Sequence, residues 1–171
     1  KVPVDLVCVG GFFAIVSARS IGIDLVPENS HRLIPLGMAV IEAANRALSV
    51  YHPERPEVAT VDVVAFHNED PETGIGKGVV IYGESNMDRS PCGTGTTAKM
   101  TLLHHRGQLG LNETFINTSP LGTTFQGRLL EEIELGDKKA VVAEVRGSAY
   151  ITGIHEFIID ARDPFQKGFL L

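Results

Sequence analysis

Short runs of apolar and β-branched residues, separated by turns that contain glycine or proline, recur along most of the chain. This pattern predicts a protein rich in β-strands. The expected strands cover residues 3–9, 12–17, 22–26, 60–68, 78–83, 113–119, 123–135, 139–147 and 149–160. The first two are either separate strands or one strand with a bulge at Gly10 and Gly11. Gly136 and Asp137 form a hairpin-turn signal between two of the longest runs.

Two segments instead carry apolar residues at helical spacing. The first follows two possible capping residues, Asn29 and Ser30, and is expected to end near Tyr51. Pro35 lies near its start, where proline is tolerated only in the first turn. The second helix is expected to cover about residues 93–105. Because helices and strands do not alternate regularly, the expected fold class is α+β, with a sheet that curls around a helix.

The composition narrows the classes of protein to consider. A chain of 171 residues forms one ordinary domain that can bury its own core. Its net charge of −6 and the lack of a basic face argue against a nucleic-acid partner, and no apolar run approaches the ~20 residues of a membrane helix. Two cysteines do not make a disulfide framework, which favours a reducing, cytoplasmic location. The chain starts without Met and in a strand-like run, so we expect a fragment or a processed chain.

The segment 88–97, DRSPCGTGTT, carries the chemistry. It leads into the second helix, where the first backbone N–H groups have no partner within the helix and the helix dipole is positive. Such a terminus binds a carboxylate or phosphate and lowers the pKa of a thiol. We therefore expect Cys92 to be the reactive residue. Asp88 could bind a cationic amine. The thiol, the anion site and the Asp88 carboxylate together therefore suit an α-amino acid.

Other interpretations of the same residues are open. Cys92 could be an inert buried thiol, and Asp88 could cap a turn through Ser90. The three threonines could serve only as helix caps: Thr94, Thr96 and Thr97. The string GTGTTA fits a dinucleotide fingerprint only weakly, because nine residues that include Pro91 separate it from the preceding strand. Cys8, in an apolar run, is expected to be a small buried residue.

The histidines are less informative. His104 and His105 are adjacent near the end of a helix and face different directions. His67 and His155 are expected to be surface or structural residues. No Cys/His pair has the spacing of a metal site, so we expect no metal.

The motif DRSPCGTGT resembles the second cysteine motif of the proline racemase family, which includes hydroxyproline epimerases. The resemblance covers nearly the whole chain, although members of this family are about twice as long and have two similar lobes. The first-lobe cysteine motif is absent, since Cys8 has no Gly-His neighbourhood. The other matching segments are GGFFAIV (10–16), HP (52–53), IYGESNMDRSPCGTGTTAKM (81–100), SPLGTTFQGRLLEE (119–132) and GSAYITGIHEFIIDARDPFQKGFLL (147–171).

The resemblance implies that residues 1–171 are the C-terminal catalytic lobe, with a curled, largely antiparallel sheet around a central helix. It also implies that about residues 158–171 pack on the missing N-terminal lobe, which carries the second catalytic residue. Members racemise or epimerise proline or hydroxyproline at Cα without a cofactor, by a two-base cysteine mechanism. A lone lobe is then expected to be inactive, and the intact protein to be a homodimer with no membrane or nucleic-acid partner.

The resemblance assigns roles within the motif. Cys92 is one of the two bases, and the N–H groups of Gly93 and Thr94 bind the substrate carboxylate. Asp88 faces the ring nitrogen, and Tyr82 packs on the ring. Two alternatives are a trans-3-hydroxyproline dehydratase of the same family and a non-catalytic redox or binding lobe with Cys92 as a sensor thiol. Retention of Cys92 argues against the dehydratase, whose members typically replace the second cysteine, often with Thr.

Overall fold

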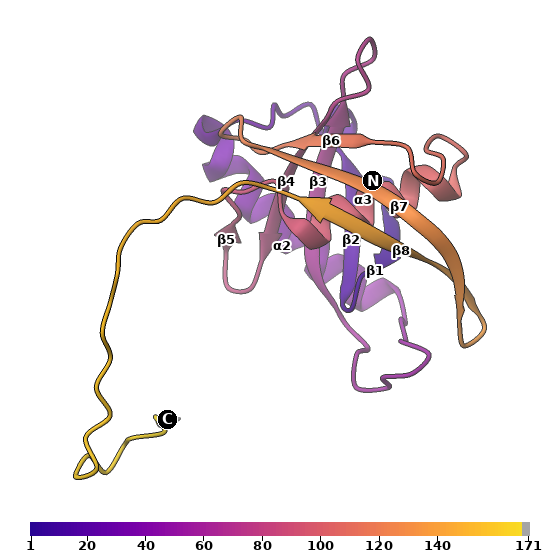
Figure 1. Ribbon diagram of the computed structural model, residues 1–171. Helices are drawn as coiled ribbons and strands as arrows, with labels where there is room; N and C mark the ends of the chain where they lie inside the picture. The colour runs from indigo at the N-terminus through magenta and orange to yellow at the C-terminus, as the bar shows by residue number, and fades with distance from the viewer. Residues whose placement is uncertain (169–171) are drawn as a thin grey trace.

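The computed structural model, which describes residues 1–168, has the predicted α+β fold (Figure 1). The strands of the described chain form one eight-stranded sheet, in the order β1-β2-β3-β4-β6-β7-β8, with β5 paired to β4. The strands are β1 (Asp5–Cys8), β2 (Phe12–Ser17), β3 (Val61–Glu69), β4 (Gly76–Tyr82), β5 (Asn86–Met87), β6 (Phe115–Thr118), β7 (Thr124–Leu135) and β8 (Lys138–Arg146). The helical elements are α1 (Ala18–Ile21), the 3-10 turn η1 (Pro27–Asn29), α2 (Ser30–Ala47) and α3 (Gly93–His105).

The sheet is mostly antiparallel and curls around α3. The pairs β2–β3 and β4–β6 are parallel, and the other pairs are antiparallel. Helix α3 contacts strands from both ends of the sheet, β1 and β8, as well as strands between them. Helix α2 lies on the other face, against β2, β3 and β4 (Figure 1). This confirms the prediction of a sheet wrapped around a central helix.

Strand alternation builds the two layers of the core, because successive side chains point to opposite faces of the sheet. In β2, Phe12, Ala14 and Val16 pack in the cluster under α2, whereas Phe13 and Ile15 pack in the cluster under α3. A third cluster, on another side of α3, joins the helix to β6, β7 and β8: Met100, Leu103, Leu109, Phe115 and Leu129, with Val141, Ala143 and Val145. Helix α3 is therefore enclosed by the curled sheet.

Three local predictions in the first third of the chain are wrong. The expected strand 22–26 does not form, and α2 ends at Ala47 rather than near Tyr51, because the backbone becomes extended at Leu48. Pro35 lies in the second turn of α2 and not in the first. It is tolerated there because it lies on the exposed face, where water can hydrate the His31 carbonyl that loses its partner.

The predicted strand 149–160 is also absent from the structure. Residues 147–168, here called the C-terminal arm, leave β8 and extend away from the body without pairing to another strand (Figure 1). A strand needs a neighbour to satisfy its backbone groups, and the described chain offers the arm none. Its large apolar side chains are exposed: Tyr150, Ile151, Ile154, Phe157, Ile158, Ile159 and Phe165. The apolar end of the chain, 169–171, lies outside the described residues.

The expectation for Cys8 is corrected as well. Its side chain is exposed, because β1 is an edge strand and α2, which covers the neighbouring Phe12 on the same face of the sheet, does not extend over β1. Over the described residues, no helix is both long and apolar enough to cross a membrane.

Candidate active site

A series of short turns carries the chain from β4 to the start of α3. After β5, the amide of Asp88 donates to the carbonyl of Val80 (2.9 Å). The Asp88 carboxylate then accepts the amide of Ser90 (2.8 Å), and the Ser90 hydroxyl accepts the amide of Cys92 (3.0 Å). The turn contact considered for Asp88 and Ser90 is therefore present. It places Cys92 at the N-cap of α3, as the sequence predicted.

The sulfur of Cys92 caps the helix. It accepts the amide of Gly95 at 3.3 Å and lies 3.4 Å from the Thr94 hydroxyl. The backbone of Cys92 has φ of +60° and ψ of 117°, a conformation that costs a non-glycine residue about 1–3 kcal/mol. The surrounding loop and helix hold it there, so the direction of the thiol is fixed by the fold.

The first turn of α3 has the donors of an anion site. Gly93 and Thr94 are exposed and come first in the helix, where N–H groups have no partner within the helix. A Cβ built at Gly93 would meet no atom within 4 Å, so a ligand can approach the backbone closely. The thiol and these two N–H groups share one helix terminus, which is the geometry that the sequence predicted.

A buried polar cluster supports the loop from behind. The Pro91 carbonyl accepts the Thr96 hydroxyl (3.2 Å) and the side-chain amide of Asn117 (3.1 Å), and that amide also donates to Thr96 (2.9 Å). Thr96 and Asn117 are almost fully buried. No sequence pattern points to Asn117, because its partners become neighbours only when β6 joins the sheet. Thr96 supports the loop and does not cap the helix.

The electrostatic environment differs from the expectation. Burial raises the pKa of the Cys92 thiol, and the nearby Asp88 carboxylate raises it further. The contacts from Thr94 and Gly95 lower this pKa, but they do not outweigh the desolvation. The prediction of an acidified cysteine is therefore wrong for this lobe. Cys92 carries its proton at neutral pH.

The structure brings Asp88 close to the thiol and places Tyr82 on the same face of the sheet. Tyr82 ends β4 and is exposed. It follows Val80 by two residues, so both point to the α3 face, and Val80 lies under the first turn of α3. Tyr82 is thus at the rim of the site.

Two cavities bordered by described residues lie away from Cys92. One of about 360 Å³ is bordered by Leu103 and Gln108, beyond the other end of α3, and one of about 590 Å³ flanks the loop between β3 and β4. Neither of these two cavities is lined by Cys92, whose side chain is partly exposed. Within residues 1–168, no three His, Cys, Asp or Glu side chains are grouped as a metal site would require.

Comparison with known proteins gives the family. Residues 1–170 match the family described as Proline racemase. The proline racemase of Clostridioides difficile is 42% identical over 99% of this chain and 51% of its own length. The trans-L-3-hydroxyproline dehydratase of Bos taurus is 36% identical over 100% of this chain and 49% of its own.

A solved structure shows the same fold. The hydroxyproline epimerase from Agrobacterium vitis, with bound trans-4-hydroxy-L-proline, is 34% identical and superposes with a TM-score of 0.84 over 99% of this chain and 49% of its own. The chain spans about half the length of the curated relatives it matches. With the motif, the curled fold and these matches in agreement along the whole chain, the protein belongs to the proline racemase family.

Proposed function

We propose that this chain is the C-terminal catalytic lobe of a racemase or epimerase that acts at Cα of proline or hydroxyproline without a cofactor. Cys92 is one of its two bases. The observation that carries the proposal is the position of the Cys92 sulfur at the start of α3, beside the outward-facing N–H groups of Gly93 and Thr94. An α-amino acid carries its Cα–H next to its carboxylate, so a base and an anion site at one helix terminus suit the two groups.

Each group has a defined task. The N–H groups of Gly93 and Thr94 bind the substrate carboxylate, and the helix dipole favours its charge. Asp88 binds the protonated ring nitrogen, and Tyr82 packs on the ring. These contacts place Cα against the thiol. They also stabilise the negative charge that spreads into the carboxylate when the Cα proton leaves.

The proton count requires a second residue. The base on the first lobe removes the Cα proton and becomes protonated, and the electron pair stays on the substrate. Cys92, which carries its proton at neutral pH, delivers that proton to the opposite face and becomes a thiolate. The configuration is inverted and the number of protons is unchanged. The reverse reaction begins with Cys92 as the base.

The exposed Gly93 and Thr94 beside the partly exposed Cys92 call for a covering lobe, because a carbanion without a cofactor is stabilised best in a site from which water is excluded. The missing N-terminal lobe supplies that cover and the second residue. The apolar side chains of the C-terminal arm, from about residue 158 onward, pack on it. The intact protein is then a homodimer of two-lobed chains.

Deuterium exchange at Cα tests the proposal. The chain is incubated in D₂O with L-proline or trans-4-hydroxy-L-proline, alone and with a first-lobe chain, taken from the half of the Clostridioides difficile enzyme that this chain does not match. The expected result is no exchange by the chain alone, exchange with the complementary half, and none when Cys92→Ala replaces the chain. Rapid exchange by the chain alone would contradict the half-site proposal. Exchange that survives Cys92→Ala would contradict the role of Cys92.

A dehydratase is the second candidate, because one of the relatives carries that name. The same mixture with trans-3-hydroxy-L-proline separates the two: water loss without inversion of proline would favour the dehydratase. A sensor thiol is less well supported. Oxidation to sulfenic acid begins from a thiolate, and burial here keeps Cys92 protonated.

A further inference from the structure

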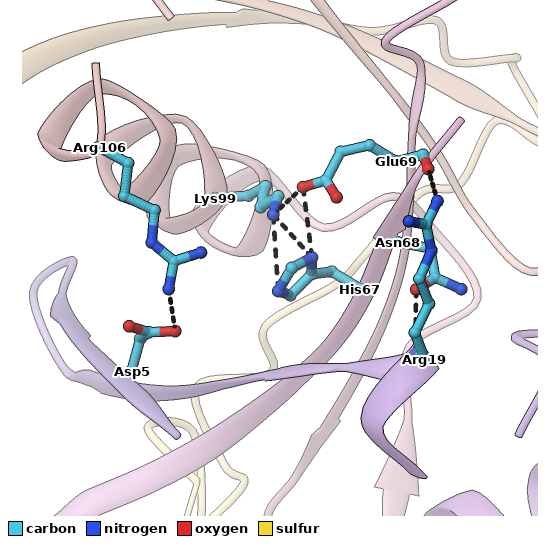
Figure 2. A network of polar contacts seen from close by, with 7 residues as sticks. All are labelled: Asp5, Arg19, His67, Asn68, Glu69, Lys99 and Arg106. Atoms are coloured by element: carbon cyan, nitrogen blue, oxygen red, sulfur yellow. Dashed lines mark hydrogen bonds and ion pairs between the residues drawn. The ribbon is translucent and has the colours of Figure 1, made fainter. Parts of the chain in front are cut away.

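A buried group of charged side chains joins the middle of α3 to the end of β3 (Figure 2). Lys99, which is only 5% exposed, forms an ion pair with Glu69, and its Nζ lies 2.6 Å from Nδ1 of His67. His67 is 8% exposed, and its Nδ1 lies 3.4 Å from the Glu69 carboxylate. The Lys99 ammonium donates to both partners when His67 is neutral. We call these three residues the α3 clamp.

Two further contacts extend the clamp (Figure 2). The first residue is Arg106, which follows the end of α3 and forms an ion pair with Asp5 of β1 at 2.7 Å. The other is Arg19, which donates to the main-chain carbonyl of Glu69 (2.9 Å) and so holds the strand end that carries this carboxylate. Cys92, Lys99 and Arg106 are spaced by seven residues, which places them along nearly one face of the helix.

Apolar packing does not by itself fix the rotation of α3. A helix with one apolar stripe has one favoured orientation against a sheet, but α3 is buried on several sides. Its buried residues are Gly95, Thr96, Ala98, Lys99, Met100, Leu102 and Leu103. The ion pair and hydrogen bond of the α3 clamp are directional, so they can fix the rotation of the helix where apolar packing does not.

The charges of the clamp have opposing effects on stability. Contacts with His67 and Lys99 lower the pKa of Glu69 to about 2, which favours the folded state. Burial also lowers the pKa of Lys99, against the attraction of Glu69, and this disfavours the folded state at neutral pH. Groups that face Lys99 from other elements are Asp5 and Arg106. A buried ion pair of this kind often adds little to stability and can instead select one arrangement.

We propose that Lys99, held by Glu69 and His67, is a positioning residue that sets the rotation of α3 and thereby the place of the Cys92 thiol. Lys99 lies seven residues, about 10 Å along the helix axis, from Cys92 and does not touch substrate. A small rotation at Lys99 turns the whole helix, so it moves Cys92 relative to the apolar cluster against which it packs. The inference rests on the proposed role of Cys92.

The test measures the alkylation of Cys92 by iodoacetamide as a function of pH, with Cys8→Ser in every sample so that Cys92 is the one thiol. The decisive variant is Lys99→Met combined with Glu69→Gln. It leaves the net charge unchanged and no buried charge without a partner, so it should fold and melt near the parent temperature. The matched control is Arg128→Met with Glu144→Gln, which removes an ion pair between β7 and β8 that faces away from α3.

Burial is the largest cause of the raised Cys92 pKa. A helix that loses its orientation exposes the thiol, so the alkylation midpoint should fall by about half a pH unit, a threefold change in thiolate fraction at a given pH. The control should keep the parent midpoint. An unchanged or raised midpoint in the decisive variant would overturn the proposal, as would an equal fall in the control. The alkylation test uses no substrate, so it is independent of the deuterium-exchange experiment. If the alkylation midpoint falls as expected but no deuterium exchange at Cα of proline is seen, the result counts against the proposed function alone.

Discussion

The amide of Gly95 donates to the sulfur of Cys92 over 3.3 Å, and no side chain fits between the two. A Cβ at position 95 would lie 2.8 Å from Val80 and 3.3 Å from that sulfur. Gly95, in the first turn of α3, therefore lies directly against both β4 and the thiol. Changes there act on stability and on the thiol together.

Gly95→Ala should destabilise the protein by about 1–3 kcal/mol, because the added methyl overpacks the contact with Val80. It should also change the rate of Cys92 alkylation. The control is Gly93→Ala, the same substitution two residues earlier where space is open, which should change stability by less than about 1 kcal/mol. Urea denaturation measures the stability of both variants. An equal loss of stability in Gly95→Ala and Gly93→Ala would contradict the close contact at Gly95.

Asp88→Asn should lower the pKa of Cys92, because it removes a negative charge that disfavours the thiolate. The amide oxygen can still accept the Ser90 amide, so the turn is kept. Alkylation at pH 8 should become faster than in the parent chain. Asp88→Glu, which keeps the charge, is the control. A slower reaction in Asp88→Asn would show that the carboxylate does not act on the thiol in this way.

Asn117→Leu should loosen the loop that leads to Cys92. The substitution leaves the carbonyl of Pro91 and the hydroxyl of Thr96 without the amide that contacts both, at a cost of about 1–3 kcal/mol. Thr118→Val is the neighbouring control, since it removes one half-buried hydrogen bond to Gly76 on the other face of β6. Hydrogen exchange of the Cys92 and Gly95 amides should rise in the first variant and stay constant in the second.

Acid should weaken the fold through Glu69. Its pKa is about 2 in the folded chain against an ordinary value of 4.5, so it contributes stability that is present above pH 4.5 and is lost as the pH falls toward 2. Glu69→Gln should therefore flatten the decline in melting temperature between these limits. A steeper decline in the variant would reverse the sign of this contribution.

Removal of residues 149–171 should leave the melting temperature within about 2 °C, because residues 149–168 are exposed along their whole length. The truncated chain should also associate less, since the exposed apolar side chains of the arm are lost. Sedimentation velocity measures association. A large drop in melting temperature would mean that the arm packs on the body in solution.

Local signals in the sequence were enough to predict the helix that carries the candidate site and one hairpin turn. Glycine, hydroxyl and cysteine residues before an apolar run predicted a helix from Gly93 to His105, and the structure confirms it. Gly136, with φ of +59°, turns β7 into β8 as its hairpin signal indicated. These features depend on neighbours within a few residues, which is the range over which sequence patterns are informative.

Features that depend on distant neighbours were missed. Nothing within a few residues of Lys99 indicates that it is buried, and only the approach of β3 makes it part of the clamp. The direction of the Cys92 pKa shift was wrong because desolvation depends on how deeply the loop sits, which no local pattern shows. The arm, residues 149–160 included, has the composition of a strand but no strand beside it.

The left-handed backbone at Cys92 has a consequence for how this protein can be altered. Among the twenty amino acids, glycine alone adopts φ of +60° without a steric penalty, so Cys92→Gly should fold more favourably than the parent while losing the sulfur to which we assign the proton transfer. Thermostability and chemistry are thus opposed at a single position. In a library selected only for heat resistance, cysteine at position 92 should be replaced early. Survival of cysteine at that position under such selection would indicate that function was being selected as well.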